Sequence, residues 1–221
     1  MVARSRFAAL RTIRRLTLLR SLLLVLMIGT TARCVGVLGI EDATCDPTQP
    51  GCQANTSAPV DTASPLCQTY CDSVLTNCTG MYAVYVGPDT CRAVCAKLDP
   101  GKVGDESVNT VECRRSHAEN VAKFHDPQGE CSGAGPGGDG TCGANCEGYC
   151  TLMQSSCTGP FQEYASMDAC LTACRAVPDK GGFDSSQTVG NTLQCRLWHA
   201  SVAAASPNPH CRHAAGASPC N

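Results

Sequence analysis

The sequence predicts an all-α, disulfide-rich protein made of two tandem units of about three short helices each. Three observations predict this class. The chain has 19 cysteines among 221 residues, one cysteine pattern occurs twice, and apolar residues recur at spacings of three and four without sustained strand alternation. Only 5% of residues are aromatic. We therefore expect crosslinks, each contributing about 2–4 kcal/mol, to replace much of a hydrophobic core.

The cysteine positions define the repeat. Five cysteines recur at an offset of 79 residues, so that Cys67, Cys71, Cys78, Cys91 and Cys95 match Cys146, Cys150, Cys157, Cys170 and Cys174. NTVECRRSH at 109–117 matches NTLQCRLWH at 191–199, and Cys131 and Cys142 match Cys211 and Cys220. The repeat predicts two helical units of eight cysteines each, at 67–142 and 143–221. Before them we expect a signal peptide at 1–32 and a tether with a small cysteine loop at 33–66.

Three helices are expected in each repeat. The first follows Ser64-Pro65, a helix cap with proline at the first helical position. The second begins near Pro88 in the first repeat and near Ser166 in the second. The third is expected to start at 105–107 or 184–185 and to run through the Cys-x3-His segments.

The first two helices each carry a CxxxC segment, which places two cysteines on one helix face. An antiparallel hairpin can join two such faces by two rungs, which predicts Cys67–Cys95 with Cys71–Cys91 and Cys146–Cys174 with Cys150–Cys170. We further expect the pairs Cys78–Cys113, Cys157–Cys195, Cys131–Cys142 and Cys211–Cys220, and a small loop closed by Cys45–Cys52. Eight cysteines allow 105 pairings, so other connectivities stay open outside the hairpins.

The N-terminus has the layout of a secretory signal. A basic stretch precedes the apolar run SLLLVLMIG at 21–29, and small residues end at Ala32. Stable disulfides also need an oxidising compartment, so we expect export to the periplasm, the outer surface or the extracellular space. From Arg33 onward there are 11 basic and 19 acidic residues. This acidic product argues against nucleic acid or an anionic membrane surface as a partner.

Cys34 is the odd cysteine. It follows the apolar run directly and precedes the tether, which suggests lipidation and attachment to a membrane. Arg33 before it fits a lipidation signal poorly. Ordinary cleavage after Ala32, leaving Cys34 free or paired with another chain, is the alternative.

Residues 67–220 resemble a type of cysteine-rich secreted protein predicted in myxobacteria-like genomes. Tyr70-Cys71, NCTG at 77–80, CR at 195–196, HA at 199–200 and HCRHA at 210–214 carry the resemblance. The first repeat departs from it with ECSGA at 130–134. The resemblance implies location and architecture, and no activity.

His199, His210 and His213 are the candidate metal ligands. With Cys195 they would give a composition suited to zinc or copper. Against this, Cys195 has a duplicate in Cys113 and an expected disulfide role. A packed imidazole is the competing interpretation.

No catalytic motif of the types CxxC, CxxCH, GxSxG or HExxH occurs, so we expect neither an enzyme nor a resident cofactor. The leading hypothesis is an exported, disulfide-stapled structural or binding module, held at the cell envelope, whose partner is an unidentified protein or envelope component. The alternative is a metal- or haem-binding extracytoplasmic protein that uses the histidines of the second repeat.

Overall fold

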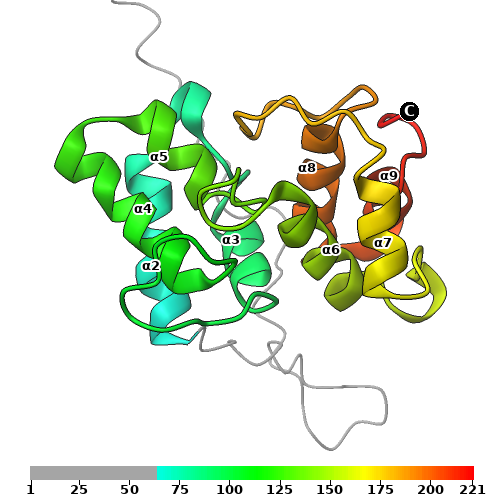
Figure 1. Cartoon of the computed structure of the whole chain (residues 1–221), viewed down its shortest axis with the longest axis horizontal. Coiled ribbons are helices and arrows are strands. Elements are labelled where there is room, and N and C mark those ends of the chain that lie inside the picture. The colour runs from blue at the N-terminus through cyan, green and yellow to red at the C-terminus, as the bar shows by residue number, and fades with distance from the viewer. Residues whose placement is uncertain (1–63) are drawn as a thin grey trace, which may run out of the picture. The chain divides into compact units, whose positions relative to one another are not determined.

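The computed structural model describes residues 64–221, and this part of the chain is helical without a strand (Figure 1). The first repeat contains α2 (Pro65–Asn77), η1 (Gly80–Tyr82), α3 (Pro88–Cys95), α4 (Val111–Phe124) and α5 (Pro127–Ala134). The second contains α6 (Asn145–Ser156), η2 (Gly159–Phe161), α7 (Met167–Cys174), α8 (Leu193–Ala203) and α9 (Pro207–Ala214). The all-α class is confirmed. The number of helices is corrected, because each repeat has a fourth α-helix, α5 or α9.

Polar caps start the helices. Ser64 Oγ accepts the Cys67 N–H at 3.3 Å, and Ser166 caps α7 in the same way. The expected starts of the third helix at 105–107 and 184–185 are wrong. Asp105 instead accepts hydrogen bonds that hold a turn, and the caps of α4 and α8 are Thr110 and Thr192. The acidic residues therefore stabilise the preceding loops.

All sixteen cysteines in 64–221 form disulfides. The two hairpins carry the expected rungs Cys67–Cys95, Cys71–Cys91, Cys146–Cys174 and Cys150–Cys170. The remaining pairs differ from those expected and are Cys78–Cys131, Cys113–Cys142, Cys157–Cys211 and Cys195–Cys220. The expected pairs Cys78–Cys113, Cys157–Cys195, Cys131–Cys142 and Cys211–Cys220 are thus wrong.

The fourth helix explains the difference. It packs against the first helix of its repeat, as α5 does on α2 and α9 on α6. Its cysteine therefore reaches the end of that first helix, as Cys131 reaches Cys78. The last cysteine of the repeat then returns to the third helix, as Cys142 reaches Cys113. The C-terminal segment of each repeat is thereby fixed at two points.

A tyrosine pair is repeated in each unit. In the first repeat the Tyr70 hydroxyl lies 2.7 Å from the Tyr85 hydroxyl and donates to the Ala134 carbonyl at 2.6 Å. In the second repeat the Tyr149 hydroxyl lies 3.0 Å from that of Tyr164 and donates to the carbonyl at the equivalent position in α9. Burial raises the pKa of Tyr85 to about 12, so both rings of the first pair keep their protons. The pair holds the fourth helix against the first.

A polar junction joins the two repeats, and α3 of the first packs against α8 of the second. The segment 178–192 contacts the first repeat through its backbone: the Phe183 N–H donates to Ser132 Oγ at 3.0 Å, and the Ser185 N–H donates to the Ala83 carbonyl at 2.6 Å. Asp139 accepts the Gly182 N–H at 2.9 Å. The two described repeats therefore belong to one compact unit.

Several expectations fall outside residues 64–221. They are the signal peptide, the tether up to residue 63, the Cys45–Cys52 loop and any lipid on Cys34. Within the described range no helix is long and apolar enough to cross a bilayer.

Candidate functional site

Three histidines of the second repeat come together where α8 meets α9. One ring nitrogen of His199, His210 and His213 lies within 4.8 Å of one ring nitrogen of each of the others. The closest pair is Nδ1 of His199 and Nδ1 of His210, 2.9 Å apart. His199 is 4% exposed, whereas His210 and His213 are half-buried. The histidine cluster therefore has a buried side and a side that faces solvent.

The scaffold positions both helices of this cluster. Thr192 caps α8, and Cys195–Cys220 ties that helix to the C-terminal segment. The α9 helix is held by Cys157–Cys211 and by the Tyr149 hydroxyl bond. Positions 210 and 213 are three residues apart on a helix, so their side chains lie on one face. The backbone departs from helical dihedral angles only at Asn208, before both histidines.

A backbone carbonyl orients His199. Its Nε2 lies 3.3 Å from the Thr188 carbonyl, so Nε2 carries the proton and donates. Nδ1, which faces His210, is then left with a free lone pair. A hydrogen bond from the other ring nitrogen to a carbonyl is the usual way in which proteins fix the orientation of a metal-binding imidazole.

Burial keeps this imidazole neutral. It lowers the pKa of His199 to about 4, with further lowering by the nearby His210 and His213. Burial, with His213 beside it, also lowers the pKa of His210. A neutral imidazole is the form that binds cations.

Two buried polar atoms at this cluster lack a partner. Within residues 64–221, neither Nδ1 of His213 nor the indole nitrogen of Trp198 makes a hydrogen bond. The Trp198 ring contacts His199 edge-on, with centroids 4.7 Å apart. Unpaired buried polar atoms are uncommon and call for an explanation.

The first repeat has a different arrangement at the equivalent position. His117 Nδ1 is hydrogen-bonded to the Glu130 carboxylate, and its Nε2 lies 3.2 Å from the Glu106 carbonyl. Glu130 thus takes the place of His210. Gly133 takes the place of His213, and a Cβ there would lie 2.9 Å from Thr141. The shared parts are therefore one histidine and its carbonyl partner.

The three histidines that the sequence suggested as metal ligands lie close together. Cys195 is the further ligand that the sequence suggested. Cys195 and Cys220 lie close to His199, as Cys113 and Cys142 do to His117. All four sulfurs are in disulfides and carry no thiolate. Neither the Thr188 carbonyl nor the His117–Glu130 pair could be predicted from the sequence, because the first depends on the path of a loop and the second on the packing of α5 against α4.

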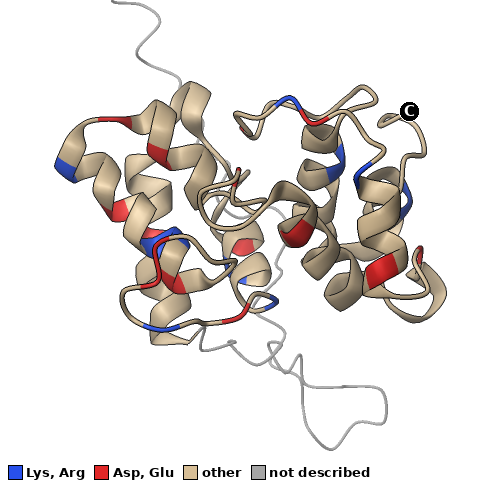
Figure 2. Ribbon diagram, in the orientation of Figure 1, with Lys and Arg blue, Asp and Glu red and all other residues tan. Residues whose placement is uncertain are grey.

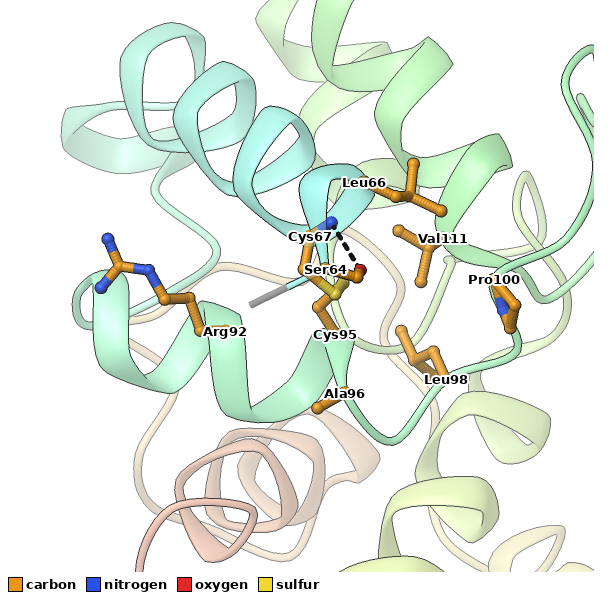
Figure 3. A pocket seen from close by; sticks show the side chains of 9 residues that line it. All are labelled: Ser64, Leu66, Cys67, Arg92, Cys95, Ala96, Leu98, Pro100 and Val111. Carbon is orange, nitrogen blue, oxygen red and sulfur yellow. Dashed lines mark hydrogen bonds between the residues drawn. A yellow bond between two sulfur atoms is a disulfide. The ribbon is translucent and has the colours of Figure 1, made fainter. Parts of the chain in front are cut away.

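A groove lies beside the start of α2 (Figure 3). Its wall is largely apolar, with Leu66, Leu98 and Val111 around the Cys67–Cys95 disulfide and Arg92 at one end (Figure 3). Arg92 is the one charged side chain in this lining. The groove offers no acid and base pair for catalysis.

Acidic and basic segments are interspersed over the helices of both repeats (Figure 2). No basic stripe runs along the described helices in this view.

Comparison with known proteins gives two partial matches. Residues 144–219, about a third of the chain, match the model of the BfoA family C-terminal domain. A stretch of 65 residues is 35% identical to an EGF-like domain-containing protein of Acanthamoeba polyphaga mimivirus. That stretch is 29% of this chain and 12% of the viral protein. No solved structure matches the chain.

Both matches fit a cysteine-rich protein, and the first covers the second repeat with its histidine cluster. The myxobacterial resemblance stays a prediction. Eight disulfides in 64–221, together with the likeness to a protein with an EGF-like domain, indicate an exported structural or binding module.

Proposed function

We propose that the chain is a non-enzymatic binding module of the cell envelope, displayed on a tether and anchored through Cys34. Its partner is a protein or another envelope component, and not nucleic acid. The leader and tether come from the sequence, and the folded part is residues 64–221.

The duplicated skeleton carries this proposal. Both repeats share four disulfides at equivalent positions, the tyrosine pair, and a threonine cap on the third helix. They differ at partly exposed positions such as 130 and 210. A constant frame with varied surface positions is the design of a recognition scaffold, and two linked copies suit bivalent attachment.

The polar contacts also favour binding over catalysis. Within the described residues, no serine hydroxyl or thiol is hydrogen-bonded to a histidine. Activated nucleophiles depend on such a bond. The one imidazole–carboxylate pair there, His117 with Glu130, lacks a neighbouring nucleophile among its hydrogen-bond partners.

Detergent-phase partition of exported protein tests the proposal. We expect the wild type to enter the detergent phase, Cys34→Ser to stay in the aqueous phase, and the matched control Cys45→Ser/Cys52→Ser to behave as the wild type. A cytoplasmic product with alkylatable thiols would contradict export. Equal partition of the wild type and Cys34→Ser would contradict the anchor, and covalent labelling by a serine-hydrolase probe would contradict the non-enzymatic role.

A further inference from the structure

The two closest imidazole nitrogens of the second repeat are spaced for a shared ligand. A zinc ion binds histidine nitrogens at about 2.0–2.1 Å, so two nitrogens in a tetrahedral site lie about 3.3 Å apart. Nδ1 of His199 and Nδ1 of His210 are 2.9 Å apart, a few tenths of an ångström less. A small opening of this pair admits one ion between them.

His213 supplies a third donor from the same helix face as His210. A ring nitrogen of His213 lies within 4.8 Å of both other nitrogens. The side chain is half-buried, so it can turn toward the ion. Its buried Nδ1 has no hydrogen-bond partner within residues 64–221. A bound ligand would give this nitrogen the partner that it lacks.

We propose that His199, His210 and His213 form a binding site for one divalent transition-metal ion of the zinc and copper class. Three imidazole nitrogens suit such borderline ions and do not suit calcium or magnesium, which prefer oxygen ligands. The Thr188 carbonyl accepts the Nε2 proton of His199 and so keeps Nδ1 free to bind the ion. His210 binds as its Nε2–H tautomer, which frees Nδ1.

The proposal goes beyond the envelope module, since that role needs no metal. Three protein ligands leave a fourth position on the solvent side for water or an outside donor. A hydrogen-bonded imidazole pair without metal is the competing account, because one proton between His199 and His210 would also bring the nitrogens to this distance.

The first repeat provides the matched control. His117 occupies the same place on α4 as His199 does on α8 and also faces a backbone carbonyl through Nε2. Glu130 and Gly133 stand where the second repeat has His210 and His213, so the first repeat offers fewer imidazole donors. A site that needs three histidines exists only in the second of the two described repeats.

Isothermal titration calorimetry with ZnCl2 on the oxidised mature chain, stripped with a chelator and carrying no polyhistidine tag, tests the site. We expect one ion per chain, and a loss of affinity of more than about 100-fold in His210→Ala and in His213→Ala, since even the loss of a group that only hydrogen-bonds to a ligand costs about 10–100-fold. His117→Ala should bind as the wild type, and MgCl2 should give no heat of binding at this site. The two ligand variants change half-buried residues, and far-UV circular dichroism checks that they stay folded.

Three results would overturn the proposal. One is that the wild type binds no zinc, which would leave a hydrogen bond between His199 and His210 as the account of their close contact. Another is unchanged affinity in both ligand variants, which would place the ion elsewhere. The third is an equal loss of affinity in His117→Ala.

Discussion

Arg114→Met tests how much a buried cation contributes to the first repeat. The Arg114 side chain is fully buried, and no carboxylate accepts a hydrogen bond from it. Its guanidinium donates to the carbonyls of Gly135, Thr110 and Pro136 and to the side-chain oxygen of Asn109, at 2.8–3.1 Å. Burial lowers its pKa, yet the four acceptors keep the charge satisfied.

Methionine keeps much of the side-chain volume but donates no hydrogen bond. The Thr110 carbonyl still accepts the Arg114 backbone N–H, at 3.4 Å, so three acceptors lose a donor. Each buried acceptor left unpaired costs about 1–3 kcal/mol. Removing the charge offsets part of this cost, because a buried ion carries a desolvation penalty. We expect a net loss in the free energy of unfolding of about 2–4 kcal/mol.

Arg196→Met is the matched control, because Arg196 holds the equivalent place in the second repeat. It is half-buried and makes only two bonds, to the Ala215 carbonyl and to Asn191, both at 3.3 Å. We expect a loss of about 1 kcal/mol or less. Urea unfolding followed by far-UV circular dichroism, with disulfides intact, measures both. Equal losses in the two variants would refute the argument from buried hydrogen bonds.

Other predictions concern the crosslinks and the junction. Cys157→Ser/Cys211→Ser opens a loop with a sequence separation of 54 and should cost about 4 kcal/mol, against about 3 kcal/mol for Cys150→Ser/Cys170→Ser with a separation of 20; urea midpoints of both compare them, and the reverse order would contradict the loop-entropy account. Ser132→Ala removes the acceptor of a buried N–H of the second repeat and should cost about 1–3 kcal/mol; unchanged hydrogen exchange of that amide would count against a rigid junction. Strong reductant should unfold the mature chain, because its core is thin, and helical circular dichroism that persists without disulfides would show that the crosslinks are dispensable.

The first two helices of each repeat and the hairpin disulfides could be predicted because they depend on local spacing. Cys67 and Cys71 share a face by helical geometry alone, and the caps at Ser64 and Ser166 act within three residues. The fourth helix could not be predicted in this way. α5 has the sequence PQGECSGA, with two glycines and little amphipathic pattern, and the packing of Cys131 and Tyr70 determines its place.

The same missing helix explains the four wrong disulfide pairs, since their choice depends on where Cys131 and Cys211 lie in space. The histidine cluster depends on the same helix, because α9 carries two of its three members. Positions 130 and 133 of the first repeat, which match His210 and His213, hold Glu130 and Gly133. In the structure Glu130 is hydrogen-bonded to His117, as His210 lies beside His199, and the packing of the fourth helix on the third brings these side chains together.

The central claim is that one four-disulfide skeleton staples both repeats of an exported module. Non-reducing peptide mapping of the mature protein, alkylated before digestion, tests this most directly. The account predicts no alkylated cysteine in residues 64–221 and linked peptides for Cys78–Cys131 and Cys113–Cys142, with the equivalent pairs in the second repeat. Free thiols among these cysteines, or different connectivities in the two repeats, would contradict it.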